Sequence, residues 1–116
     1  MLVFVYGTLK RNGSNHHCLA DQRFIGDAAT KPLFRLYDLG GYPGMVSDFQ
    51  TGVSVSGEVW EVDASCLKQL DLLEDTDGGE YVREIMPLEA PFEAQVIEGY
   101  RYLRSVAGRR DLGSRW

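Results

Sequence analysis

The sequence has few of the residues that build disulfide frameworks and metal sites. Its two cysteines, Cys18 and Cys66, stand far apart among 116 residues and match no metal-ligand spacing. Two free thiols are typical of a reducing compartment, so we expect a cytoplasmic protein. His16 and His17 directly precede Cys18, but neighbouring side chains on a helix point about 100° apart. We therefore expect a partly exposed helical turn there and no metal site.

Long apolar runs and an excess of positive charge are missing as well. No run of about 18 apolar residues occurs, which excludes a membrane-spanning helix. Met1 leads directly into apolar residues, without a basic segment or a small-residue cleavage site, so we expect no secretory signal. The net charge of −5 and the isoelectric point near 4.9 argue against nucleic acid or an anionic membrane as the main partner.

The motifs of several large enzyme classes do not occur. There is no P-loop, no G-x-G-x-x-G dinucleotide fingerprint and no G-x-S-x-G nucleophile motif. Cys18 and His17 are neighbours in sequence, which does not make them a catalytic dyad. The chain lacks repeats and linkers, and 44% of its residues are hydrophobic and 25% charged. These features predict one globular domain that spans residues 1–116.

The first apolar stretch, Leu2 to Tyr6, predicts a strand that is buried on both faces. Gly7 and Thr8 end it, and Lys10 and Arg11 are typical of a solvent-exposed segment. A buried strand that ends in a glycine turn leaves backbone N–H groups unpaired, and such groups can bind an anion. Considered alone, these residues fit an ordinary turn better, and only the rest of the chain favours an anion site.

Short and mostly extended elements are expected up to the middle of the chain. They are a helical turn from His16 to Asp21 with Asn15 as its N-cap, an extended segment from Arg23 to Asp38, turns at Leu39–Gly44 and Asp48–Gly52, and a strand from Val53 to Val62. Pro32 within the extended segment indicates either an edge position or a break. The last strand alternates between its two faces. Gly57 within it marks a bulge or a close approach of two backbones.

One helix and a pair of strands are expected in the second half. They are a helix from Ala64 to Glu74 with Asp63 as its N-cap, and strands at 80–88 and 93–103 that a turn at Pro91 joins. The tail from Arg104 to Trp116 has no periodicity, although we expect Leu112 and Trp116 to dock on the core.

Strands and helices do not alternate along the chain. The pattern therefore predicts an α+β fold with about six strands in a mainly antiparallel or mixed sheet, one clear helix and one short helix.

Glu74 occupies an unusual place on the expected helix. Leu67, Leu70 and Leu73 form the apolar stripe, and Glu74 follows Leu70 by four residues, so it projects from the core-facing side. The helix dipole is also unfavourable for an anion in the last turn. Burial without a cation would raise the pKa of Glu74 from about 4.3 toward neutrality and suit it to general-base catalysis. Two alternatives stay open: fraying that lets Glu74 reach water, and an ion pair with Arg83.

The acidic stretch after this helix partly matches the calcium-loop template D-x-[DN]-x-[DN]-G-x₅-E. Asp75, Asp77 and Glu84 fall on its third, fifth and twelfth positions. The first position holds Leu73 in place of an acid, and a strand pattern from Tyr81 replaces the second helix of an EF-hand. We interpret the match as coincidental.

Six segments in a fixed order carry a resemblance to a known family. They are V-F-V-Y-G-T-L-K-R (Val3–Arg11), N-H (Asn15-His16) with Leu19, Y-P-G (Tyr42–Gly44), G-E-V-W-E-V-D (Gly57–Asp63), L-D-L-L-E (Leu70–Glu74) and Y-V-R (Tyr81–Arg83). Together they resemble the γ-glutamylcyclotransferase superfamily and, within it, the short γ-glutamylamine cyclotransferase and AIG2-like proteins. The resemblance runs from residue 2 to about residue 104.

The resemblance implies a compact mixed β-barrel with short helices packed around it and a pocket at the end of the first strand. In that pocket Glu74 is the catalytic acid/base. The residues that the resemblance assigns to substrate binding, the first four through their backbone, are Tyr6, Gly7, Thr8, Leu9, Tyr42 and Tyr81.

The implied activity is the release of 5-oxoproline from a small γ-glutamyl amine or γ-glutamyl amino acid, without a metal or an organic cofactor. The implied partner is that small molecule, with no nucleic acid and no membrane, and these residues set no oligomeric state. The acidic, glycine-rich stretch from Asp75 to Glu80 departs from the family pattern and is expected to shape the pocket differently. Since the superfamily also contains proteins without the glutamate, a non-catalytic module that binds a small carboxylate on the same fold is the alternative.

Overall fold

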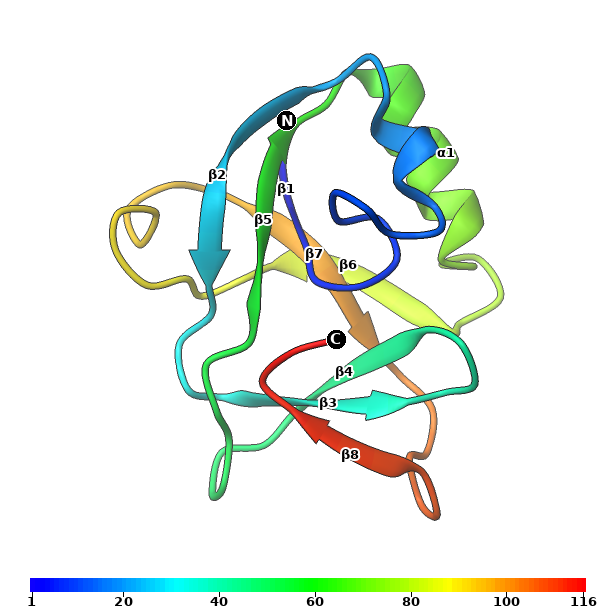
Figure 1. Ribbon diagram of the computed structural model, residues 1–116, viewed down its shortest axis with the longest axis vertical. Helices are drawn as coiled ribbons and strands as arrows, with labels where there is room; N and C mark the ends of the chain where they lie inside the picture. The colour runs from blue at the N-terminus through cyan, green and yellow to red at the C-terminus, as the bar shows by residue number, and fades with distance from the viewer.

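Eight strands, one α-helix and one 3₁₀ turn make up the computed structural model, which describes residues 1–116 (Figure 1). The two helical elements are η1 (His16–Leu19) and α1 (Ala64–Leu73). The strands are β1 (Leu2–Val5), β2 (Arg23–Ala29), β3 (Phe34–Asp38), β4 (Pro43–Ser47), β5 (Ser56–Glu61), β6 (Tyr81–Ile85), β7 (Glu98–Tyr102) and β8 (Arg110–Gly113).

The strands form two sheets. The larger has the order β2-β5-β1-β7-β6, and the smaller has the order β4-β3-β8. β1 pairs antiparallel with β5 and parallel with β7, so the larger sheet is mixed. An α+β fold with a mixed sheet is therefore confirmed. The compact β-barrel that the resemblance implies does not close, because the strands divide into two separate sheets, the smaller of which lies below the larger in Figure 1.

β1 is the central strand of the larger sheet, and its two faces serve two different parts of the core. Val3 and Val5 belong to one hydrophobic cluster and Phe4 to the other, and none of the three is more than 3% exposed. This confirms the strand buried on both faces. On neighbouring β5, a Cβ on Gly57 would lie 2.4 Å from the carbonyl oxygen of Val5, which confirms the expected close approach of two backbones.

α1 starts where the sequence predicts. The carboxylate of Asp63 accepts a hydrogen bond from the N–H of Cys66 at 2.7 Å, which confirms the N-cap. Beside this first turn lies η1, whose Cys18 carbonyl accepts a hydrogen bond from the Cys66 thiol at 3.5 Å. Asn15 is the N-cap residue of η1, as predicted, but its side chain makes no capping hydrogen bond, because its amide donates to the hydroxyl of Thr8 instead.

α1 ends in a Schellman motif, one residue before Glu74. Asp75 adopts a left-handed conformation with φ of 53°. Its N–H bonds to the carbonyl of Leu72, and the N–H of Thr76 bonds to the carbonyl of Asp71, both at 3.2 Å. Glu74 is therefore the C-cap of the helix, whereas the sequence places it in the last turn.

Two edge strands, β4 and β8, were not predicted from the sequence. The sequence predicts a turn up to Gly44, whereas the chain forms β4 from Pro43 onward; proline is tolerated there because it is the first residue of an edge strand. The sequence predicts no element after Arg104, whereas β8 pairs with β3 at the other edge of the smaller sheet. Leu112 of β8 packs on the core as expected, but Trp116 does not dock and is 37% exposed.

The remaining extended segments are confirmed with shorter bounds. Pro32 lies between β2 and β3, so of the two expectations for this proline the break is confirmed. β5 starts at Ser56 rather than Val53, and the antiparallel partner of β6 starts at Glu98 rather than 93. Val96, assigned to the strand by its alternation, lies before it and is 66% exposed.

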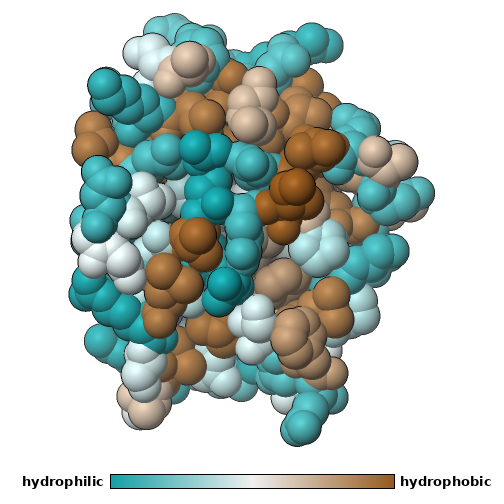
Figure 2. All heavy atoms as spheres, turned by 180° about the vertical axis from the view of Figure 1, so that it is seen from behind, coloured by the Kyte–Doolittle hydropathy of each residue, from teal (hydrophilic) through white to brown (hydrophobic).

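No helix of the structure has the length and apolar character needed to cross a membrane. The face opposite to the view of Figure 1 carries hydrophobic residues interspersed with hydrophilic ones (Figure 2).

Candidate active site

A cavity of about 240 Å³ opens where the end of β1 meets the end of α1. Every residue predicted for the site from the sequence lines it: Tyr6, Gly7, Thr8, Leu9, Tyr42, Glu74 and Tyr81. The structure thus brings all seven together, although the sequence spreads them over 76 positions (6 to 81). Four further polar residues line the cavity that were not assigned to catalysis or substrate binding: Ser14, Asn15, Glu80 and Tyr100.

The turn after β1 presents unpaired backbone donors to this cavity. The N–H groups of Gly7, Thr8 and Leu9 have no hydrogen-bond acceptor within the protein, and all three residues line the cavity. The turn is closed by a bond from the Lys10 N–H to the carbonyl of Gly7 at 3.1 Å. Consecutive free N–H groups of this kind form an anion-binding concavity.

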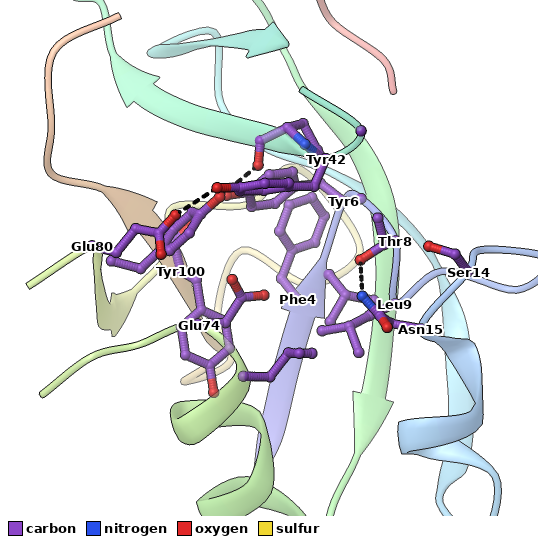
Figure 3. A pocket seen from close by; sticks show the side chains of 16 residues that line it. Phe4, Tyr6, Thr8, Leu9, Ser14, Asn15, Tyr42, Glu74, Glu80 and Tyr100 are labelled. Atoms are coloured by element: carbon purple, nitrogen blue, oxygen red, sulfur yellow. Dashed lines mark hydrogen bonds between the residues drawn. The ribbon is translucent and has the colours of Figure 1, made fainter. Parts of the chain in front are cut away.

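Close packing and a second loop fix the shape of the turn. A Cβ on Gly7 would lie 2.6 Å from the Cγ of Pro43, so only glycine fits there without movement of the proline ring. Thr8 is held through its carbonyl, which accepts from the Asn15 N–H at 2.9 Å, and through its hydroxyl, which accepts from the Asn15 amide at 3.0 Å (Figure 3).

A buried carboxylate anchors the far end of the turn. Glu58 of β5 is 6% exposed and accepts hydrogen bonds from the backbone N–H and the Nε of Arg11, both at 3.0 Å. It also accepts one from the indole N–H of Trp60 at 3.1 Å. Burial raises its pKa, but these hydrogen bonds outweigh burial, so the pKa of Glu58 lies below its ordinary value. Sequence reasoning gave Glu58 no role; its charge within a strand of apolar neighbours was the available signal.

Glu74 faces the turn from the opposite side of the cavity (Figure 3). Its carboxylate has no hydrogen bond and no ion pair within the protein, unlike that of Glu58. Burial raises the pKa of Glu74 to about 7, and the negative charge of Glu80 adds to this effect. The alternative pair with Arg83 does not form, because the guanidinium bonds to Asp71 at 2.9 Å and to Glu98.

Two tyrosines that line the cavity donate their hydroxyls to backbone carbonyls of the protein. Tyr6 donates to the carbonyl of Tyr100 at 2.7 Å, and Tyr81 donates to the carbonyl of Pro43 at 2.8 Å. Burial raises the pKa of both phenols, so both stay neutral at physiological pH. Their rings therefore form walls of the cavity.

A bridge between two loops closes one side. The hydroxyl of Tyr42 donates to Glu80 at 2.9 Å, which joins the loop before β4 to the loop after α1 (Figure 3). This hydrogen bond raises the pKa of Tyr42. The acidic stretch that departs from the family pattern thus contributes directly to the wall of the cavity.

No group of three or more His, Cys, Asp or Glu side chains is placed to hold a metal ion. In the calcium-loop alternative, the residues after Glu80 form strand β6 where an EF-hand needs its second helix. His16 uses its ring Nδ1 in a contact of 3.0 Å with the carbonyl of Leu9, so it supports the turn.

Comparison with known proteins identifies the family of the chain that forms this pocket. A family model described as "Gamma-glutamyl cyclotransferase, AIG2-like" matches residues 3–116. This chain belongs to that family. A protein of Vibrio cholerae, named as a candidate gamma-glutamylcyclotransferase, is 50% identical over 112 residues, which cover 97% of this chain and 92% of the relative. The gamma-glutamylcyclotransferase family protein YtfP of Escherichia coli K12 is 37% identical over 114 residues, covering 98% and 93%.

Solved structures of the family share the fold. The solution structure of Escherichia coli YtfP has a TM-score of 0.73 at 35% identity and covers 100% of this chain and 96% of its own. The crystal structure of an AIG2-like protein from Mus musculus has a TM-score of 0.74 at 29% identity, covering 90% and 76%. The resemblance read from the sequence segments is therefore confirmed at the level of the family.

Proposed function

We propose that this protein is a cyclotransferase that releases 5-oxoproline from a small γ-glutamyl amine or γ-glutamyl amino acid. One observation carries the proposal: an unpaired carboxylate with a pKa of about 7 faces three unpaired backbone N–H groups across a small cavity. A cavity of about 240 Å³ suits a glutamyl group with a short substituent. Membership of the family supports the same reaction.

The N–H groups of Gly7, Thr8 and Leu9 bind the α-carboxylate of the substrate. This contact leaves the α-ammonium group and the γ-carbonyl to extend toward Glu74. Because the attacking nitrogen belongs to the substrate, the protein needs no nucleophile of its own. Its task is to hold the chain in a folded conformer, and such intramolecular arrangements reach effective molarities of roughly 10⁵ M or more.

Glu74 moves the proton. Its ionised carboxylate removes a proton from the α-ammonium, and the free amine attacks the γ-carbonyl carbon to close a five-membered ring. The bond from that carbon to the leaving amine then breaks, and Glu74 returns its proton to the departing nitrogen. The ring nitrogen, which still carries one extra proton after the attack, loses that proton to solvent and becomes the lactam N–H of 5-oxoproline. A pKa of about 7 suits both steps, since the group is half ionised near neutral pH.

The test is a panel of γ-glutamyl amines and γ-glutamyl amino acids, with released 5-oxoproline as the readout. We expect wild-type turnover on at least one class and a loss of about 10²–10⁴-fold in kcat for Glu74→Gln. Glu93→Gln, an exposed glutamate outside the cavity, is the matched control and should keep wild-type turnover.

Two results would contradict the proposal. Full turnover by Glu74→Gln would remove Glu74 from the mechanism. Binding of the panel compounds by the wild type without any release of 5-oxoproline would favour the alternative, a module that binds small carboxylates through the same turn.

A further inference from the structure

A cluster of charged residues beside the cavity has no part in the mechanism above. Arg83 of β6 forms a two-point ion pair with Asp71 of α1, from Nε to Oδ1 at 2.9 Å and from Nη2 to Oδ2 at 3.2 Å. Its Nη1 bonds to Glu98 of β7. Tyr100 donates its hydroxyl to the same Asp71 Oδ1 at 2.8 Å.

This cluster lies directly next to Glu74. Asp71 precedes Glu74 by three residues, and residues with that spacing share one side of a helix end. The carbonyl of Asp71 also accepts the Thr76 N–H in the motif that ends α1. Arg83 stands opposite Tyr100 in the β6–β7 ladder, and the Tyr100 ring lines the cavity. The ion pair thus ties the end of α1 to the hairpin that forms one wall.

The titratable groups around Glu74 include no cation. They are Tyr6 at the end of β1, Tyr42 in the loop before β4, Glu80 in the loop after α1, Tyr81 of β6 and Tyr100 of β7. All five are acids or phenols. Arg83 itself does not line the cavity. It is two residues from Tyr81 on the same face of β6 and stands opposite Tyr100, and both of these tyrosines do line it.

We propose that Asp71 is a positioning residue that holds Arg83 away from Glu74 and fixes the helix end from which Glu74 enters the cavity. The inference rests on the proposed role of Glu74 as the base, because only an unpaired carboxylate performs that role near neutral pH. When Asp71 is neutral, the charge of Arg83 is only partly compensated by Glu98 and stabilises the ionised form of Glu74.

The experiment follows the Glu74 carboxyl by NMR during a pH titration of the free protein, without substrate. Asp71→Asn keeps the size of the side chain and an oxygen for the Tyr100 hydroxyl. We expect it to lower the Glu74 midpoint by about one unit or more. Asp71→Asn/Arg83→Gln, which removes the cation as well, should return the midpoint to the wild-type value. The pH profile of kcat/KM should shift in the same direction as the midpoint in each variant.

Glu84→Gln is the matched control. It removes the ion pair with Arg101 from the same hairpin but from the opposite face of β6, and should leave the Glu74 midpoint unchanged. If Asp71→Asn does not fold, Arg83→Gln alone tests the same claim. Arg83→Gln removes the cation and keeps Asp71, so the Glu74 midpoint should rise or stay at the wild-type value.

Three results would overturn the inference: an unchanged midpoint in Asp71→Asn, a double variant with the same low midpoint as the single one, or a lowered midpoint in Arg83→Gln. The titration needs no turnover. A midpoint that behaves as expected in a protein that releases no 5-oxoproline would leave this inference standing and refute the proposed function.

Discussion

Two glutamates differ sharply in their environments: Glu58, which holds the turn after β1 through Arg11, and Glu74, which lines the cavity. Glu58 anchors the turn after β1 and accepts three hydrogen bonds, two of them from Arg11. Glu74 ends α1 and accepts none. The pKa of Glu58 lies below its ordinary value, whereas that of Glu74 is raised to about 7.

The difference shows that burial alone does not decide what a carboxylate does. Burial disfavours the ionised form of both groups, and only the donors around Glu58 reverse that effect. A carboxylate with donors stays charged and holds structure in place. A carboxylate without them gains and loses a proton near pH 7, which is the property that a general acid/base requires.

The largest effect is expected from removal of the partnered carboxylate. Glu58→Ala leaves the buried indole N–H of Trp60 without its acceptor and removes the pair between buried Glu58 and half-exposed Arg11, and it should lower the free energy of unfolding by about 3 kcal/mol. Urea unfolding measures this. Glu61→Ala, on the same strand, removes only an exposed pair with Arg23 at 3.7 Å and should change stability by about 0.5 kcal/mol or less. Equal losses of unfolding free energy in Glu58→Ala and Glu61→Ala would contradict the structural role assigned to the hydrogen bonds of Glu58.

Removal of the Glu74 carboxylate, which has no partner, should raise the free energy of unfolding rather than lower it. Because the folded-state pKa of Glu74 is raised from 4.5 to about 7, the folded protein holds a proton that the unfolded chain releases in this window. Stability therefore falls as pH rises from about 4.5 to 7, and the loss is complete above that range.

Glu74→Gln should abolish this loss. We expect it to raise the free energy of unfolding at pH 8 by about 2 kcal/mol, a value reduced for solvent that reaches the carboxylate from the cavity, and to change little at pH 4. Urea unfolding at the two pH values, with Glu93→Gln as the control, measures the difference. A gain that is the same at both pH values would argue against a raised pKa.

A smaller change in stability is expected from a substitution at Asp75, the residue that follows Glu74 at the end of α1. Asp75 holds φ of 53°, a conformation that glycine adopts without steric cost. Asp75→Gly should therefore stabilise the protein by about 0.5 kcal/mol, measured as a shift of the urea midpoint. Asp77→Gly is the control, since Asp77 has no positive φ and should gain nothing. A loss of stability in Asp75→Gly would show that its side chain holds the helix end.

Local patterns predicted much of the fold. The unbroken apolar run of β1 predicted a strand buried on both faces, and Asp63 predicted the start of α1. The edge strand β4 was missed because it begins with Pro43 and Gly44, which are typical of a turn, although its partner β3 directly precedes it. The edge strand β8 was missed because it carries charged residues and pairs with β3 from a distant part of the sequence. Whether the β-barrel implied by the resemblance closes depends on how distant strands pair, and no local pattern contains that information.

The candidate site was also predicted only in part: local patterns predicted some of its features, and contacts between distant residues determined the others. Spacing along α1 placed Glu74 toward the core, and the glycine after β1 predicted free N–H groups. That Glu74 is unpaired could not be predicted, because Arg83, its candidate partner in the sequence, bonds to Asp71 and Glu98 instead, and no local pattern shows which acid it pairs with. The role of Glu58 was missed for a similar reason, since its partner Arg11 lies 47 residues away.

The most direct test of the contrast is a titration of both carboxyl groups in one sample of the free wild-type protein. Site-resolved NMR of the Glu58 and Glu74 carboxyl carbons should give a Glu74 midpoint at about 7 and a Glu58 midpoint below 4.5. A Glu74 midpoint at or below 4.5 would contradict the account, because the carboxylate would then be ionised throughout the neutral range and too weak a base for the proposed proton transfer.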